Sequence, residues 1–328
     1  MMPMGPVMVI LGVIVSLIGA VVGSFLNVCI YRLPWEKSVI WPASHCPRCW
    51  NPIAAYDNIP ILGWLLLRGK CRRCGLPISP RYPLIELLVA VLFVAIFVVD
   101  VVYGPRGRYG YEIGVPLATW FYHAILVSLL VAATFIDYDL YIIPDSITLT
   151  GMILGVAGGW ILPEIRPAPS TAATYWQGLA VGLGGLLVGG GLMEFVRRVA
   201  NLVYSAILSI GNRRVTSGEA MGFGDVTLMA MIGAFLGWQA ALLTFFIGPF
   251  FGLGTALVKI VNKYRKLIAG RQLSVTDREV PFGPYLCAGA LFLVLTWRWL
   301  WPGWAAGLFD TFRWIFWFLL GVNAGPPY

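Results

Sequence analysis

Charged residues are scarce in this chain of 328 residues. They make up 12% of it, whereas roughly a quarter of the residues of a soluble protein are charged. Asp and Glu together number 15 and His only 2, while 59% of the residues are hydrophobic. This composition excludes a secreted, fibrous or disordered protein. It predicts helices packed in a lipid bilayer, where 38 glycines permit close contacts and 14 tryptophans suit the interfaces.

No Lys or Arg precedes the first apolar run, at residues 7–28, which is also too long for a signal-peptide core. We expect it to remain as a membrane helix. Seven further spanning helices are expected at residues 83–102, 115–136, 145–162, 174–196, 225–238, 240–261 and 283–300. The predicted fold is therefore an all-α polytopic membrane bundle of about eight helices. Residues 304–322 add either a ninth span or an aromatic-rich interfacial helix.

The basic residues are distributed unevenly. Three segments, 32–82, 197–222 and 259–282, hold 18 of the 23 Lys and Arg residues. The loops between them hold only Arg106, Arg108 and Arg166. Because basic loops stay in the cytoplasm, the N-terminus is expected outside and segment 32–82 inside. The net charge of +8 is then a signal of orientation, and no nucleic-acid partner is expected.

Segment 32–82 contains two C-x2-C pairs separated by 21 residues. The candidate metal ligands are Cys46, Cys49, Cys71 and Cys74. Two such turns complete a tetrahedral four-sulfur site that suits structural Zn2+ and anchors a short segment without a core of its own. Two disulfides or a redox-active pair are the alternatives; the reducing cytosol disfavours the first, and the lack of a βαβ pattern disfavours the second.

Three further residues near these patterns have ordinary interpretations. His45 adjoins the first cysteine pair and is either a competing ligand or a surface histidine. Cys29 and Cys287 fall in or near apolar helices, where small core residues are expected.

Two carboxylates fall at expected helix ends on the cytoplasmic side. Asp137 lies at the end of one expected helix. Asp225, 88 residues later, lies at the start of another, after Gly222 and Gly224 and before an apolar run. If they meet, they share a proton, and one can activate water while the other protonates the carbonyl or the leaving amine. Taken singly, an N-cap for Asp225 and a solvated helix end for Asp137 are the alternatives. Asp139 and Asp145 remain competitors.

Several ordered blocks of residues resemble the bacterial prepilin peptidases, also called type IV leader peptidases, which are membrane aspartic proteases of the GxGD class. The resemblance covers most of residues 18–290. Its blocks are Gly23-Ser24-Phe25-Leu26-Asn27-Val28, Tyr31-Arg32-Leu33-Pro34, the cysteine pairs, Asn58-Ile59-Pro60, Arg81-Tyr82-Pro83-Leu84-Ile85-Glu86, 137–145, Gly222-Phe223-Gly224-Asp225, 232–238 and Pro281-Phe282-Gly283-Pro284.

The resemblance implies cleavage of the leader of type IV prepilins or type II secretion pseudopilins at the cytoplasmic face of the bacterial inner membrane. Asp137 and Asp225 match the two catalytic aspartates, and Gly222 and Gly224 match the active-site loop. Many members also methylate the new N-terminus with S-adenosylmethionine, and the cysteine segment is associated with that activity or with substrate handling. The implied division is residues 1–31, first helix; 32–82, zinc segment; 83–302, peptidase core; and 303–328, C-terminal extension.

Some features depart from the family pattern or support methyl transfer only weakly. Thr227 stands where the family commonly has Lys, and Trp50 follows the first cysteine pair where Gly would favour a regular turn. The glycine-rich run 182–191 lies inside an apolar stretch and reads as a packing face, so no S-adenosylmethionine site is assigned. Two other functions remain: a multi-span transporter, and a noncatalytic pilin assembly factor with a zinc lobe.

Overall fold

The protein is described by a computed structural model that covers residues 4–104, 114–166, 172, 174–210, 221–268 and 281–319. These residues contain ten α-helices and no β-strand. The helices are α1 (Met4–Arg32), α2 (Leu62–Leu66), α3 (Arg81–Phe97), α4 (Gly114–Leu140), α5 (Asp145–Ile161), α6 (Tyr175–Ile210), α7 (Gly224–Leu236), α8 (Trp238–Ile268), α9 (Gly283–Leu300) and α10 (Ala306–Leu319). The expected all-α architecture is confirmed.

Within the described ranges, six stretches of helix are long and apolar enough to cross a membrane. They are Pro6–Trp35, Arg81–Val102, Val115–Leu140, Tyr175–Ala206, Trp238–Val261 and Gly283–Ile315. Helices α5 and α7 are apolar but shorter, with 17 and 13 residues. At about 1.5 Å per residue α7 is about 20 Å long, less than the roughly 30 Å hydrocarbon core. The chain is a multi-pass membrane protein, and the crossing of α5 and α7 stays a prediction.

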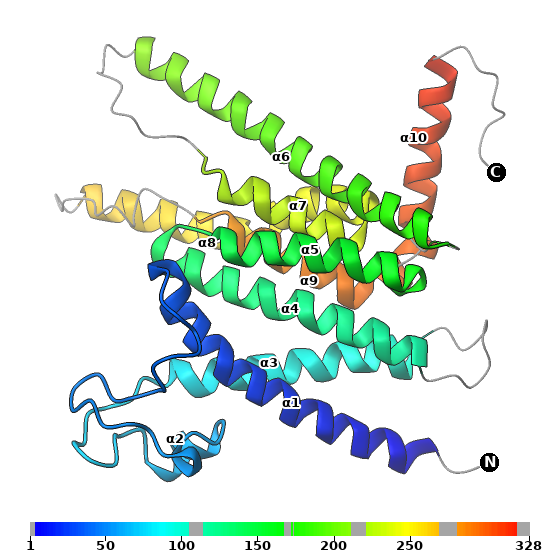
Figure 1. Cartoon of the computed structure of the whole chain (residues 1–328). Coiled ribbons are helices and arrows are strands. Elements are labelled where there is room, and N and C mark those ends of the chain that lie inside the picture. The colour runs from blue at the N-terminus through cyan, green and yellow to red at the C-terminus, as the bar shows by residue number, and fades with distance from the viewer. Residues whose placement is uncertain are drawn as a thin grey trace.

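The helices run back and forth, so that their ends gather on two sides (Figure 1). The C-terminal ends of α1, α4, α6 and α8 lie on the same side as α2, and the N-terminal end of α1 and helix α10 lie on the other. Helices α6 and α8 end at Ile210 and Ile268, well beyond the expected 196 and 261. A helix is not obliged to stop where its apolar stretch does, because its backbone bonds are satisfied in water as in lipid.

Glycines set the closest helix crossings. On α1, Gly19 and Gly23 lie against α3, where an added Cβ would be 2.8 Å from Cα of Ala90 and 2.7 Å from Cα of Glu86. Between α6 and α7, an added Cβ on Gly185 or Gly233 would be 2.0 Å from the carbonyl oxygen of the other. Small residues let helix backbones approach this closely. The glycine-rich run on α6 is therefore a packing face, as predicted.

A buried arginine lies at the end of the bundle opposite α2. Arg166 is 1% exposed and donates hydrogen bonds to the carbonyl oxygens of Gly178, Gly155 and Ala234, at 2.5, 2.9 and 3.1 Å. It therefore ties α5, α6 and α7 together. From the sequence, Arg166 is only a basic residue in a loop. Its burial could not be predicted, because its three acceptors are backbone carbonyls, which residues of any type possess.

The chain turns sharply after α9. Helix α10 lies across the end of the bundle and not alongside the other helices (Figure 1). Its Phe309 stacks on Trp301, with ring centroids 5.7 Å apart, and meets the edge of Trp238 at 5.3 Å. An aromatic helix in this position fits the interfacial interpretation of residues 304–322 better than a ninth span.

Candidate functional site

Asp137 is buried at the end of α4. It lies in the last turn, which stops where Tyr141 takes a left-handed conformation with φ of 58°. Asp137 is 6% exposed overall, and its Oδ2 is buried beside Gly283, the first residue of α9, without a hydrogen-bond partner among the described residues. The N-terminus of a helix carries partial positive charge and favours an anion. Asp137 is therefore directed inward and is not the solvated helix end that was its alternative.

Asp225 lies in the first turn of α7. The N-cap of α7 is Phe223, and no side chain caps it, so the N-cap interpretation of Asp225 is wrong. Its half-buried carboxylate is close enough to that of Asp137 for their charges to act on each other. The fold thus brings together two carboxylates from different helices.

Two glycines and an isoleucine fix the spacing around the carboxylates. An added Cβ on Gly283 would lie 2.5 Å from Oδ2 of Asp137 and 3.0 Å from Cδ1 of Ile143. An added Cβ on Gly224 would lie 3.1 Å from Cβ of Ile143. Ile143 is buried between them and joins the ends of α4, α7 and α9. Gly224 thus serves close packing, whereas Gly222 has open space around it.

Gly283→Ala should lower the catalytic rate of the site by roughly 100-fold, because its methyl group would displace the Asp137 carboxylate by a sizeable fraction of an ångström or more. The measurement is kcat for the reaction proposed below. Gly254→Ala is the matched control, since that helical glycine has open space around it. Equal rates for the two variants would contradict this geometry.

Other side chains border the pair. Cys287 is buried one turn after Gly283 and senses the charge of both carboxylates. Thr227 is buried and donates its hydroxyl hydrogen bond to the carbonyl of Gly224 at 3.0 Å, so it supplies no charge. The guanidinium of Arg197 on α6 lies 5.6 Å from the ring centroid of Phe223. A cation therefore approaches the Asp225 turn from another helix.

The competing aspartates are directed elsewhere. Asp139 forms an ion pair with Arg81, with a shortest N–O distance of 2.6 Å. Asp145 is exposed as the first residue of α5. Neither joins Asp137 at the N-terminus of α9.

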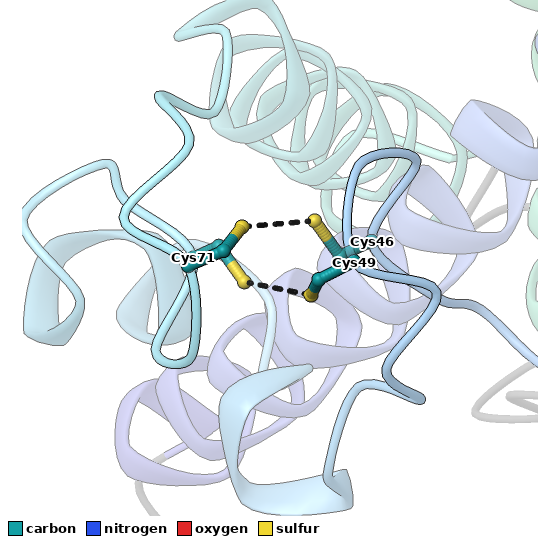
Figure 2. A group of neighbouring side chains, drawn as sticks. Cys46, Cys49 and Cys71 are labelled. Atoms are coloured by element: carbon teal, nitrogen blue, oxygen red, sulfur yellow. Dashed lines mark hydrogen bonds between the residues drawn. The ribbon is translucent and has the colours of Figure 1, made fainter.

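The four cysteines of segment 32–82 converge on one point (Figure 2). Their sulfur atoms all lie within 4.8 Å of one another, with 3.7 Å between Cys46 and Cys74 and 4.0 Å between Cys49 and Cys71. Zinc–sulfur bonds of about 2.3 Å place tetrahedral sulfurs about 3.8 Å apart. The cluster therefore has the size and donor set for a tetrahedral thiolate-bound metal ion.

The two cysteine turns share one backbone pattern. The N–H of Cys46 bonds the carbonyl of Asn51 and the N–H of Cys71 bonds that of Leu76, at 3.0 and 2.8 Å. Backbone N–H groups, of Cys49 first, lower the pKa of Cys46 to about 6, and that of Cys74 likewise lowers the pKa of Cys71. Thiolates are thus favoured at Cys46 and Cys71, as metal binding requires. At Cys74 the N–H of Leu76 lowers the pKa, but burial and hydrogen bonds with the other cysteines outweigh it and raise the pKa to about 11.

The residues after the two pairs share a left-handed backbone. Trp50 has φ of 55° and Gly75 has φ of 70°. Trp50 stacks on His45, with ring centroids 5.0 Å apart, and Nδ1 of His45 bonds the carbonyl of Ala43. His45 lies outside the sulfur cluster, as the surface interpretation predicts.

Two contacts in this lobe involve arginines next to the cysteines. Arg72 forms an ion pair with Asp57 at 2.6 Å and lowers the pKa of that carboxyl, and Arg73 donates to Oδ1 of Asn51. Glu86 of α3 accepts a 2.6 Å hydrogen bond from the N–H of Ile61 and so holds the lobe against the bundle.

Known proteins resemble this chain along most of its length. Residues 17–99 match the model of the bacterial peptidase A24 N-terminal domain, and residues 124–257 match that of the type IV leader peptidase family. A prepilin leader peptidase/N-methyltransferase from Myxococcus xanthus is 37% identical, over 89% of this chain and 73% of the relative. A protein of the same name from Aeromonas hydrophila is 34% identical, over 87% of this chain and 90% of the relative. Another from Klebsiella pneumoniae is 37% identical, over 70% of this chain and 86% of the relative. No solved structure matches the chain.

Proposed function

Because the chain belongs to the type IV leader peptidase family, we propose that it is a membrane aspartic endopeptidase. It removes the leader of type IV prepilins or type II secretion pseudopilins and then methylates the new N-terminus. The observation that carries this proposal is that Asp137 and Asp225 interact electrostatically, at ends of α4 and α7 that approach the start of α9 around Ile143. This arrangement supplies the two acid–base groups that aspartic-protease chemistry needs.

In the proposed mechanism the two carboxylates share one proton. The ionised one removes a proton from a water molecule as the water attacks the scissile carbonyl, and the protonated one donates its proton to the carbonyl oxygen. The proton taken from water then passes to the leaving amine as the C–N bond breaks, and a hydroxyl of the tetrahedral intermediate returns its proton to the other carboxylate, which restores the singly protonated pair. The N-terminus of α9, at Gly283, lies against the carboxylate of Asp137. Burial of Asp137 itself limits competing water around its carboxylate.

Methyl transfer is the second proposed activity, with S-adenosylmethionine as the methyl donor. Its support is the name of the relatives, prepilin leader peptidase/N-methyltransferase. No residue is assigned to donor binding.

The tetracysteine cluster is proposed to hold structural Zn2+ through Cys46, Cys49, Cys71 and Cys74. Four protein ligands leave no position for a catalytic water, so the ion would stabilise the lobe without taking part in hydrolysis. This supports dividing the chain into a first helix (1–31), a zinc segment (32–82), a peptidase core (83–302) and a C-terminal extension (303–328).

The proposed location is the bacterial inner membrane, with the N-terminus outside and the zinc segment in the cytoplasm. The basic segments support this orientation. A precursor leader would then stay in water while the apolar helix behind it lies in lipid beside the bundle. The partners are the precursor and membrane lipid.

Family membership disfavours the transporter and the noncatalytic assembly factor. A transporter is also expected to carry acids near the membrane midplane, whereas these carboxylates lie at helix ends. Sealed membrane vesicles of both orientations, incubated with a prepilin-type precursor, test the proposal. Inverted vesicles should remove the leader and right-side-out vesicles should not. Absence of cleavage in both, or cleavage only by right-side-out vesicles, would contradict it.

The rate of cleavage should pass through a maximum as the pH is changed. Below it both carboxylates are protonated and no base remains, and above it both are ionised and no acid remains. The profile of kcat/KM against pH should show two apparent pKa values that belong to the pair. A flat profile from about pH 4 to 9 would count against the shared proton.

A further inference from the structure

An ion pair links the N-terminus of α3 to the last turn of α4. Arg81 donates two hydrogen bonds to Asp139, from Nη1 to Oδ1 at 3.0 Å and from Nη2 to Oδ2 at 2.6 Å. Its guanidinium also lies 5.1 Å from the ring centroid of Phe135. The planar guanidinium therefore contacts the final turn of α4 at two points, which fixes geometry better than a single charge contact does.

Asp139 and Asp137 present opposite faces of that turn. Residues two apart in an α-helix are separated by about 200° around its axis. Asp137 accordingly points to Gly283 of α9, while Asp139 points to Arg81 of α3. Asp139 thus binds the last turn of α4 to Arg81 of α3, while Asp137 on the other face of the turn points to the candidate site.

The last turn of α4 carries excess negative charge. The C-terminus of a helix has a partial negative charge, and the carboxylates of Asp137 and Asp139 add to it, so a nearby cation stabilises the turn. Thr227 supplies no charge from the α7 side. Arg81 provides the compensating charge, and a bidentate pair resists rotation of the turn.

Arg81 is itself anchored. Its N–H bonds Oγ of Ser79 at 3.3 Å, and Nδ2 of Asn27 on α1 bonds the carbonyl of the next residue, Tyr82, at 3.2 Å. The guanidinium therefore extends from a fixed helix start.

From these contacts we propose that Arg81 is a positioning residue for the peptidase reaction, which holds Asp137 at the N-terminus of α9 by binding Asp139. The inference rests on the proposed function. Arg81 touches neither carboxylate of the pair, so its effect on the reaction is indirect.

The test is a double-mutant cycle on leader cleavage. Arg81→Gln and Asp139→Asn should each lower kcat by roughly 10- to 100-fold with KM changed less than threefold, since a small displacement of a catalytic group costs rate. The double variant should lose no more than either single variant. The exchange Arg81→Asp with Asp139→Arg should recover activity above both single variants, and Arg81→Lys should fall between wild type and Arg81→Gln.

Arg313→Gln is the matched control, because Arg313 forms an exposed ion pair with Asp310 on α10. It should leave kcat unchanged. Thermal unfolding of each variant in detergent identifies any that fails to fold, and the charge exchange and Arg81→Lys then carry the test.

Wild-type kcat in Arg81→Gln would overturn the inference, as would losses that multiply in the double variant. A loss confined to KM would point to substrate binding and would also overturn it. These outcomes require an active wild type. If the wild type removes no leader, the proposed function itself fails, which separates the two results.

Discussion

Asp137→Asn and Asp225→Asn should each reduce the rate of leader cleavage on the order of 10²- to 10⁴-fold, the usual contribution of general acid–base catalysis. Asn keeps the volume of Asp but cannot take up or release the shared proton. Asp137 is buried beside Gly283, and Asp225 lies in the first turn of α7 without capping it. Neither carboxylate therefore has an evident purely structural duty that would make the substitution unfold the protein. The measurement is kcat/KM on a prepilin-type precursor.

Asp145→Asn is the control for these variants. Asp145 is exposed at the start of α5, the same kind of position as Asp225 at the start of α7, and caps no helix. It should retain wild-type cleavage. Full activity in either Asp137→Asn or Asp225→Asn would remove that residue from the mechanism.

Cys46→Ser should abolish binding of the metal ion and loosen residues 32–82. In zinc-finger peptides the metal contributes about 10–16 kcal/mol to folding, so a lobe built from turns depends on it heavily. Within the described part of this lobe the longest helix is α2, with five residues. Zinc measured by atomic emission should fall from one ion per chain to none, and limited proteolysis should become faster within the lobe.

Cys29→Ser is the matched substitution, since Cys29 is buried in α1 outside the sulfur cluster. It should keep one zinc ion per chain. One zinc ion per Cys46→Ser chain, with unchanged proteolysis, would argue against a four-sulfur site.

The membrane helices and the sulfur cluster could be predicted from the sequence, because each follows from a pattern of residues close together in the chain. The length of an apolar stretch predicts a membrane helix, and the C-x2-C spacing predicts a pair of metal ligands. The pairing of Asp137 with Asp225 follows once both are placed at helix ends on one side. The family resemblance adds the chemistry that these patterns alone leave open.

The parts of the fold and of the site that the sequence does not reveal depend on contacts with backbone groups far away along the chain. The backbone of Gly283 lies against the Asp137 carboxylate, and Arg166 binds three carbonyls, but a backbone group has no residue type to reveal such a contact. For the contact of Gly283, the family block Pro281-Phe282-Gly283-Pro284 is a signal in the sequence. The side chains of Arg72 and Arg73 bind Asp57 and Asn51, partners that no local sequence pattern indicates.

The most direct measurement is the intact mass of a prepilin-type precursor after incubation with detergent-purified wild type or Asp225→Asn, with and without S-adenosylmethionine. The account predicts loss of the leader with wild type alone, and a further gain of about 14 Da, one methylene group, only when S-adenosylmethionine is present. An unchanged precursor with wild type, or loss of the leader with Asp225→Asn, would contradict the central claim that the carboxylate pair performs the cleavage.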